Sequence, residues 1–287
     1  MFEAFTLDHV DVGEVTVRVR HGGDGPPVVL LHGHPRTHAT WCQVAPELAE
    51  THAVVCPDLR GYGQSSLPAD QPDHAQSSKR AMADDVVGLM LGLGHDRFAV
   101  VGHDRGALVA HRLTMDHPDR AERLVIMDSV PLVEALERAD WRFARDWWHW
   151  WFLGQTAKPA EVVICADPKA WYRTNGPEVM GNEAYADLWS ALHDPKVVHG
   201  MCEDYRAGLT VDYEHGEADR REDRRVECPT LFLYATEDDM EEIYGDPLAV
   251  WRPWVRNSLE GRPIHSGHHQ AEEAPEELTA ALRAFLG

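Results

Sequence analysis

VVGHDRGALVAHR, residues 100–112, has the pattern of a buried strand that passes through a tight glycine turn directly into a helix. Gly102 and Gly106 are spaced so that the chain can bend sharply without a Cβ clash. A turn of this kind exposes its central side chain above the sheet and points backbone N–H groups of the new helix at the same place. The central residue is Asp104, so the sequence predicts a carboxylate at this position.

Short apolar runs alternate with helical stretches on both sides of this turn. The runs expected to form strands occupy residues 15–20, 26–33, 52–61, 98–104, 123–131, 228–239 and 262–269. The stretches with helical periodicity occupy residues 81–94, 107–118 and 274–286. The run at 15–20 alternates in the manner of an edge strand. This order predicts an α/β fold with a mostly parallel sheet and helices on both faces.

The alternation breaks at Pro131, after which the chain is rich in tryptophan and charge and shows no clear strand until near residue 226. Within this part, residues 141–154 have a helical pattern. We therefore predict a core formed by residues 1–130 and 226–287, with a helical cap formed by residues 131–225. Such a cap would lie over the C-terminal edge of the sheet, where open α/β sheets bind ligands.

Composition limits the partners of the protein. The 287 residues have a formal net charge of −21, which argues against nucleic acid and anionic membranes as partners. No run approaches the ~20 apolar residues of a membrane span, and the first residues lack the apolar segment of a secretory signal. The five cysteines are widely spaced without CxxC, as reduced thiols are, so we expect a cytoplasmic protein. The charged run at 217–225 is expected to be a solvated connector.

Asp104 occupies the position at which many hydrolases hold a serine, and no Gly-x-Ser-x-Gly occurs in the chain. A carboxylate attacks esters poorly, but it can displace a leaving group from a saturated carbon and form an alkyl ester. Water must then hydrolyse that ester, which requires a base, an acid that orients the base, and an oxyanion hole. This chemistry needs no metal and no cofactor, and we expect none.

The base is expected from the loop after the last predicted strand. His268 is the leading candidate, His269 competes with it, and His265 is weaker. The orienting acid remains open between Asp128 and Asp238, because each follows a predicted strand on the C-terminal side of the turn.

The oxyanion hole is expected from two backbone N–H groups. One belongs to Arg105, directly after the nucleophile. The other belongs to His34, in the loop after the first buried strand, where Gly33 and Pro35 would shape the chain.

Several segments together resemble the fluoroacetate dehalogenases, which are Asp-nucleophile members of the α/β-hydrolase superfamily. The resemblance rests on HGHPRTHATW, DLRGYGQS, GHDRGA, MDHP, IMDSVP, HWWFL, CEDYRAG and SGHHQAEEAP. It covers most of the chain and is weakest at residues 170–195. It implies an α/β-hydrolase fold with an inserted cap, action on a small 2-haloacid, and a homodimer.

The resemblance also implies residue roles. Asp104 would be the nucleophile, His268 the base and Asp128 the acid. The halide pocket of the family corresponds here to His149, Trp150 and Tyr205. An imidazole N–H, an indole N–H and a phenol O–H are three donors that suit a departing halide, fluoride above all.

One position departs from the family. Two arginines hold the substrate carboxylate there; the first corresponds to Arg105, but the second position is Leu108. A lost charged hydrogen bond typically costs ~1.5–3 kcal/mol. Arg36 and His34 from the opposite loop, or Arg173 from the cap, are the candidates to compensate. We therefore expect an altered substrate preference, toward a longer or less charged haloacid.

Three other functions compete with this prediction. An epoxide hydrolase shares the nucleophile, base and acid, and needs cap tyrosines; besides Tyr205, the candidates are Tyr172, Tyr185 and Tyr213. A ligand-binding protein on a hydrolase scaffold would show little turnover. A lipase-like lid is disfavoured by the missing serine and by the negative charge.

Overall fold

The computed structural model describes residues 1–287 and contains one eight-stranded sheet in the order β1-β2-β4-β3-β5-β6-β7-β8. The strands are β1 Thr6–Asp11, β2 Thr16–Gly22, β3 Pro27–Leu31, β4 Ala53–Pro57, β5 Phe98–His103, β6 Ala121–Met127, β7 Thr230–Ala235 and β8 Leu259–Ile264. Strands β3 to β8 pair in parallel, whereas β1 pairs with β2, and β2 with β4, in antiparallel fashion. The predicted α/β architecture with a mostly parallel sheet is confirmed.

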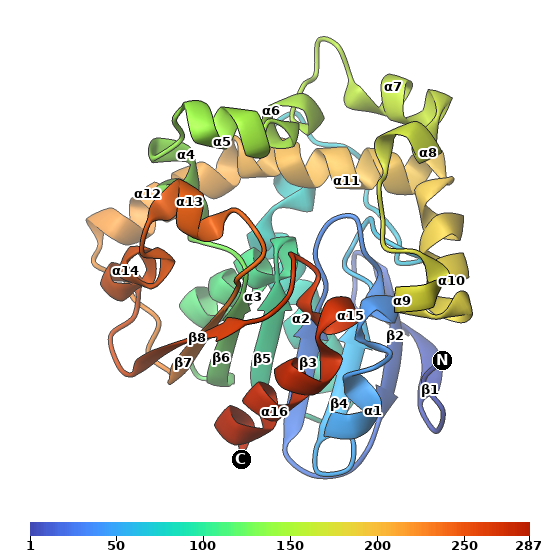
Figure 1. The fold of residues 1–287 in the computed structure, drawn as a ribbon, viewed down its shortest axis with the longest axis vertical. Helices are drawn as coiled ribbons and strands as arrows, with labels where there is room; N and C mark the ends of the chain where they lie inside the picture. Colours follow the sequence, from blue (N-terminus) through green and yellow to red (C-terminus); the bar gives the residue numbers. More distant parts are fainter.

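Helices of the core cover both faces of this sheet (Figure 1). They are α1 Ala45–Leu48, α2 Lys79–Gly92, α3 Arg105–Asp116, α13 Met240–Tyr244, α14 Pro247–Trp251, α15 Gln270–Glu273 and α16 Pro275–Leu286, with short 3-10 turns at His38–Trp41, Ala75–Ser77 and Arg252–Trp254. Helices α1 and α16 pack on one face and α2 and α3 on the other.

The alternation along a central strand explains the two layers. Val28 and Leu30 of β3 belong to the hydrophobic cluster under α1 and α16, and Val29 and Leu31 belong to the cluster under α2 and α3. Successive side chains of a strand point to opposite faces, so a continuous apolar run buries both. This is why β3 shows no polar alternation in the sequence.

The helices between β6 and β7 form a layer over the carboxyl ends of the strands, and α9 and α10 extend from it down the β2 side of the sheet (Figure 1). They are α4 Leu132–Glu137, α5 Trp141–Asp146, α6 His149–Leu153, α7 Ala160–Ala166, α8 Pro168–Trp171, α9 Pro177–Met180, α10 Asn182–Leu192, α11 Pro195–Gly208 and α12 Val211–Arg221. We call these nine elements the inserted helices; they fall within the segment 131–225 for which a cap is predicted. None of the helices of the protein is both apolar and long enough to cross a bilayer.

The stretch 141–154 is helical, as predicted, and forms two helices, α5 and α6. Two other local predictions are wrong. β1 forms this edge of the sheet, and 15–20 contributes to β2 inside the sheet. The run 217–225 is not simply solvated, because Asp219 is buried between Arg112 and Arg224, each 2.6 Å away.

Candidate active site

Asp104 lies between the end of β5 and the start of α3, as the sequence predicts. Its backbone has φ 51° and ψ −116°, a conformation that is costly for a residue with a side chain. The backbone N–H of Asp104 donates to the carbonyl of Met127 at 3.0 Å, which fixes the strained turn to the neighbouring strand β6. Such strain is characteristic of functional positions.

Glycines allow the main chain to approach this turn. A Cβ on Gly102 would lie 2.3 Å from the carbonyl oxygen of Gly106, and a Cβ on Gly106 would lie 2.3 Å from that of His32. A Cβ on Gly33 would lie 2.4 Å from Oδ1 of Asp104. The turn and the loop after β3 therefore pack closely because these side chains are absent.

The loop after β3 supplies a hydrogen bond to the Asp104 carboxylate. The backbone N–H of His34 donates to Oδ1 at 2.7 Å, as expected for one half of an oxyanion hole. The N–H of Arg105, predicted as the other half, makes no hydrogen bond to the carboxylate. It lies at the N-terminus of α3, directly after Asp104.

His268, in the loop between β8 and α15, faces Asp104. Its Nε2 lies 3.8 Å from Oδ2 of Asp104. Its Nδ1 lies 2.7 Å from Oδ2 of Asp128 and 3.0 Å from Oδ2 of Asp238. The structure thus brings both candidate acids to the same nitrogen, instead of selecting one of them.

The competing histidines lack these contacts. His269 lines the same cavity, but its Nδ1 is buried without a hydrogen-bond partner, and burial holds its pKa well below the usual range. His265 is exposed and pairs with Glu277 at 3.2 Å. Geometry therefore favours His268 as the base.

The two acids differ in their surroundings. Burial, followed by the neighbouring Asp238, raises the pKa of Asp128 to about 6. Burial also opposes the charge of Asp238, but its hydrogen bond to His268 lowers the pKa of that carboxyl. For His268, the hydrogen bonds to both carboxylates outweigh burial and raise its pKa well above the usual value. The two carboxylates therefore favour the protonated form of the His268 imidazole.

Three donors from the inserted helices face the same cavity. They are His149 and Trp150 on α6 and Tyr205 on α11. The ring of Tyr205 lies edge-on to the rings of His149 and Trp150, with centroids 6.0 Å apart in each pair. Burial lowers the pKa of His149 to about 4, so its imidazole is neutral. The residues that the resemblance assigns to a halide pocket thus lie together at one wall of the cavity.

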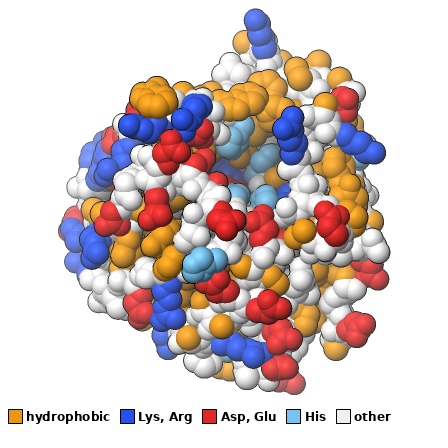
Figure 2. Space-filling view, viewed as in Figure 1, with side chains coloured by type: hydrophobic (Ala, Val, Ile, Leu, Met, Phe, Trp, Pro, Cys, Tyr) orange, Lys and Arg blue, Asp and Glu red, His pale blue; other side chains and the backbone are white.

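The cavity has a volume of about 240 Å³. Its lining residues are His34, Asp104, Asp128, Ser129, Asp146, Trp147, His149, Trp150, Tyr205, Asp238, Asp239, His268 and His269. Figure 2 shows histidine side chains gathered in a hollow below the inserted helices, with both acidic and basic side chains around it. Five aspartates line the cavity, and no lysine or arginine does.

Sequence reasoning missed one pair at this cavity. The indole N–H of Trp147 donates to both carboxylate oxygens of Asp239, at 2.8 and 3.0 Å. Trp147 also stacks on Trp150, with ring centroids 5.7 Å apart. Burial and then the adjacent Asp238 raise the pKa of Asp239 to about 6. The doubled aspartate at 238–239 is the sequence signal that could have indicated this pair.

The arginines expected to bind a substrate carboxylate are paired elsewhere. The Arg105 guanidinium is fully buried and donates to both carboxylate oxygens of Asp204, at 3.0 and 2.9 Å. Arg36 is also buried and donates twice to Glu272, at 2.7 and 3.0 Å. Neither side chain lines the cavity, so the structure does not support the expected role of Arg36, nor that of the Arg105 side chain.

The other two positions discussed for the carboxylate also lie outside the cavity. Leu108 lines a separate cavity of about 30 Å³ beside Lys79 and His111. Arg173 is exposed and absent from the catalytic cavity. His34, by contrast, lines that cavity; burial lowers the pKa of its imidazole to about 3, so it offers only neutral polar atoms.

Three groups of side chains have ligand atoms close enough to hold a metal. Two of them include His268, whose Nδ1 already contacts carboxylates. The third is Asp70, His199 and Glu203. Both ring nitrogens of His199 are used, by Asp70 at 3.0 Å and Glu161 at 2.9 Å, so this group forms an ion-pair cluster.

The fold and the site together define the class of protein. Residues 26–275 match the family model described as alpha/beta hydrolase fold, and the chain belongs to the alpha/beta hydrolase family.

Individual proteins of known sequence or structure show which members of this family the chain is similar to. The chain is 41% identical to a fluoroacetate dehalogenase from Burkholderia sp., over 100% of this chain and 95% of the relative, which confirms the resemblance. It is 31% identical to a soluble epoxide hydrolase from Corynebacterium sp. (strain C12), over 92% and 91% of the two chains. The crystal structure of an alpha/beta hydrolase from Nostoc sp. PCC 7120 is similar with a TM-score of 0.95 at 40% identity, covering 100% and 99% of the two chains.

Proposed function

We propose that this chain is a hydrolytic dehalogenase in which Asp104 displaces halide from a saturated carbon. The observation that carries the proposal is the shared cavity, which is lined by the Asp104 carboxylate and by three donors, His149, Trp150 and Tyr205. The identity to a fluoroacetate dehalogenase supports the same reaction.

In the first step, a carboxylate oxygen of Asp104 attacks the carbon and the carbon–halogen bond breaks. The halide departs toward Tyr205, Trp150 and His149, whose N–H and O–H groups replace its lost hydration. The product of this step is an alkyl ester on Asp104.

In the second step, water attacks the carbonyl carbon of that ester. His268 accepts the proton of the water through Nε2, and Asp128 and Asp238 stabilise the resulting imidazolium. The N–H of His34 stabilises the negative charge that develops on the carbonyl oxygen. The bond between Cγ of Asp104 and the ester oxygen that is attached to the substrate carbon then breaks. That oxygen leaves with the product and takes the proton held by His268, which gives the alcohol, and the oxygen of the water remains on the Asp104 carboxyl group, which loses its proton.

For the substrate skeleton, we propose a small halogenated two-carbon compound of the haloacetate type. The cavity of about 240 Å³ suits a molecule of this size. Fluoroacetate and chloroacetate are therefore the first compounds to test.

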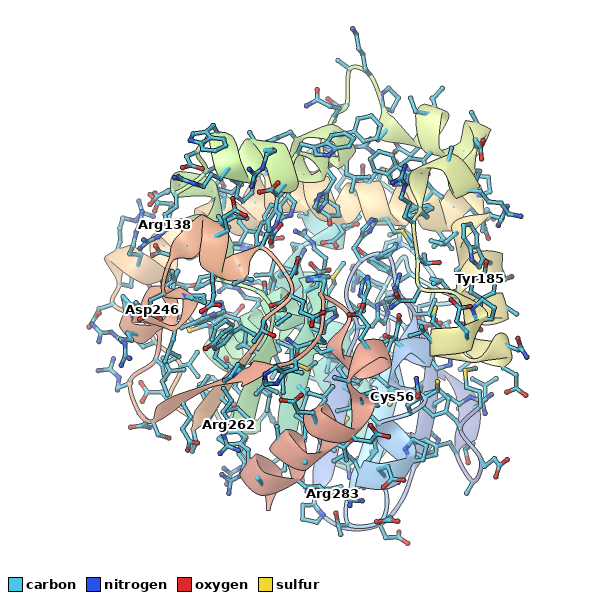
Figure 3. All side chains as sticks on the ribbon, viewed as in Figure 1. Cys56, Arg138, Tyr185, Asp246, Arg262 and Arg283 are labelled. Atoms are coloured by element: carbon cyan, nitrogen blue, oxygen red, sulfur yellow. The ribbon has the colours of Figure 1, made fainter.

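The alternative, an epoxide hydrolase, receives less support from the tyrosines. Tyr205 lines the cavity, but the hydroxyl of Tyr172 contacts the sulfur of Met201 at 3.5 Å and that of Tyr213 contacts Glu137 at 3.2 Å. Tyr185 lies on α10 at the outer side of the inserted helices (Figure 3). A pair of phenols that could protonate an epoxide oxygen is therefore absent from the cavity.

The test is halide release by purified protein, with Asp104→Asn as the inactive variant and Asp24→Asn, an exposed aspartate without side-chain partners, as the matched control. A single turnover in ¹⁸O-water should place the label on Asp104 and not in the product. Diol formation from epoxides without any halide release would favour the alternative, and binding without turnover would favour a ligand-binding scaffold.

A further inference from the structure

The charged side chains around the cavity bear on whether the substrate is an anion or a neutral molecule. The lining contains five aspartates and neither a lysine nor an arginine. The Nδ1 atom of His268, which lines the same cavity, is already engaged by Asp128 and Asp238. A substrate that carries its own carboxylate must also come close to the carboxylate of Asp104, since Asp104 has to attack its carbon, and the two negative charges repel each other.

The positive charges nearest to the site are screened from the cavity. The Arg105 guanidinium lies behind the aromatic wall, 4.2 Å from the ring of Tyr205 and 5.2 Å from that of Trp150. Its Nε and Nη2 donate to Asp204, and Asp204 also accepts from Lys79 and from the Tyr62 hydroxyl, while Nη1 of Arg105 is buried without a partner. The buried carboxylate of Asp204 thus compensates most of the positive charge behind the wall, and none of these cations lines the cavity.

Two aspartates of the lining, Asp146 and Asp239, which we call the aspartates of the rim, offer acceptors where a carboxylate-binding site would offer donors. Asp239 uses its two oxygens for Trp147, and Asp146 is paired with the exposed Arg145 at 2.6 Å. Carboxylate oxygens have further lone pairs that accept from N–H groups. They repel a substrate carboxylate and attract the N–H groups of an amide.

We propose that the cavity selects a neutral organohalide, of the 2-haloacetamide class, over the carboxylate with the same skeleton. This inference rests on the proposed function and names the charge of its substrate. The amide N–H groups face the aspartates of the rim, and the halomethyl carbon faces Asp104. Tyr205, Trp150 and His149 receive the halide as before.

The reaction balances with water as the only co-reactant. Asp104 forms an ester with the CH2 carbon as halide leaves with the bonding electrons. Water then cleaves the ester at its carbonyl carbon and gives 2-hydroxyacetamide. The net products are this alcohol, one halide ion and one proton.

The experiment compares halide release from chloroacetamide, chloroacetate, fluoroacetamide and fluoroacetate under one set of conditions. Because chloroacetamide alkylates thiols and the chain has five free cysteines, Asp104→Asn supplies the background, and 2-hydroxyacetamide is quantified directly. We expect kcat/KM for each amide to exceed that of its carboxylate by ~10-fold or more, which corresponds to one or two unfavourable charge contacts.

Two variants test whether the negative charge of the lining causes the difference in kcat/KM between amides and carboxylates. Asp239→Asn removes a negative charge from the lining and should raise kcat/KM for chloroacetate relative to chloroacetamide. Arg173→Ala removes an exposed cation outside the cavity and should leave both values unchanged.

The outcomes separate the two proposals. Carboxylates turned over as efficiently as the amides, or a loss of chloroacetate turnover in Arg173→Ala, would overturn the substrate inference and leave the dehalogenase intact. No halide from any of the four compounds would overturn the proposed reaction, and the substrate inference with it.

Discussion

The Nε2 atom of His268 faces Oδ2 of Asp104 across 3.8 Å, a separation beyond a direct hydrogen bond. His268 therefore leaves the carboxylate free to attack, and it is positioned to act on water once the ester has formed. The two steps of the proposed reaction thus depend on different side chains, and they can be separated by mutation.

Replacing the base should stop the reaction at the ester. In His268→Gln, halide displacement continues because it uses Asp104, but turnover falls by ~10²–10⁴-fold because no base activates water. Intact-mass measurement should show the alkyl group on the enzyme, together with a burst of one halide per chain. His9→Gln, at an exposed position of β1, is the control. Loss of halide release without any mass increase would contradict the assigned roles.

The pH profile should report the pair of acids. His268 works as a base only when neutral, and its pKa is raised by Asp128 and Asp238, so turnover should increase as pH rises through that pKa. Asp238→Asn removes one charge that stabilises the imidazolium, and the rise should move to lower pH. The measurement is kcat against pH for the wild type, Asp238→Asn and the control Asp24→Asn. An unchanged midpoint would mean that Asp128 alone sets the pKa.

The buried charges behind the aromatic wall should matter for stability. Asp204 and Arg105 are fully buried, so Asp204→Asn leaves the cations of Arg105 and Lys79 undercompensated. We expect a loss of ~3–5 kcal/mol in the free energy of unfolding. Urea denaturation provides the measurement. Glu137→Gln, which breaks the exposed pair with Arg220, should cost less than ~1 kcal/mol, and equal losses in the two variants would refute the argument.

Catalysis should require glycine at position 33, because there is no room for a side chain there. A Cβ there would lie 2.4 Å from Oδ1 and 2.5 Å from Cβ of Asp104, so Gly33→Ala must displace the nucleophile or the loop. A shift of about 1 Å typically costs ~10²-fold in rate. Gly92→Ala, whose Cβ would meet nothing closer than 3.8 Å, should leave kcat unchanged. Measured kcat values for the two variants decide the point, and a fully active Gly33→Ala enzyme would show that the turn tolerates a Cβ.

Much of the architecture was predictable because it follows from local patterns. The apolar runs of β3 to β8 and the periodicity of α2, α3 and α16 are visible in the sequence, and their order implies a parallel sheet. The polar strand β1 was missed, since its residues are mostly exposed and lack an apolar face. The break at Trp147 was missed because α5 and α6 continue the same aromatic pattern.

Some residues of the site were predictable from local patterns, and others were not. The glycine turn and the late histidine loop indicated Asp104 and His268, because these positions depend on chain order and strand ends. The ion-pair partners of Arg105 and Arg36 were not predictable, since Asp204 and Glu272 lie 99 and 236 residues further along the chain.

The sequence by itself determined the α/β fold and the carboxylate at the turn after β5, and its resemblance to the fluoroacetate dehalogenases indicated the donors of CEDYRAG and HWWFL. Only the tertiary structure decided which charges are available to a ligand. An arginine is a cation in any sequence, but burial against a specific carboxylate removes its charge from the cavity, and that pairing exists only once distant segments have packed together.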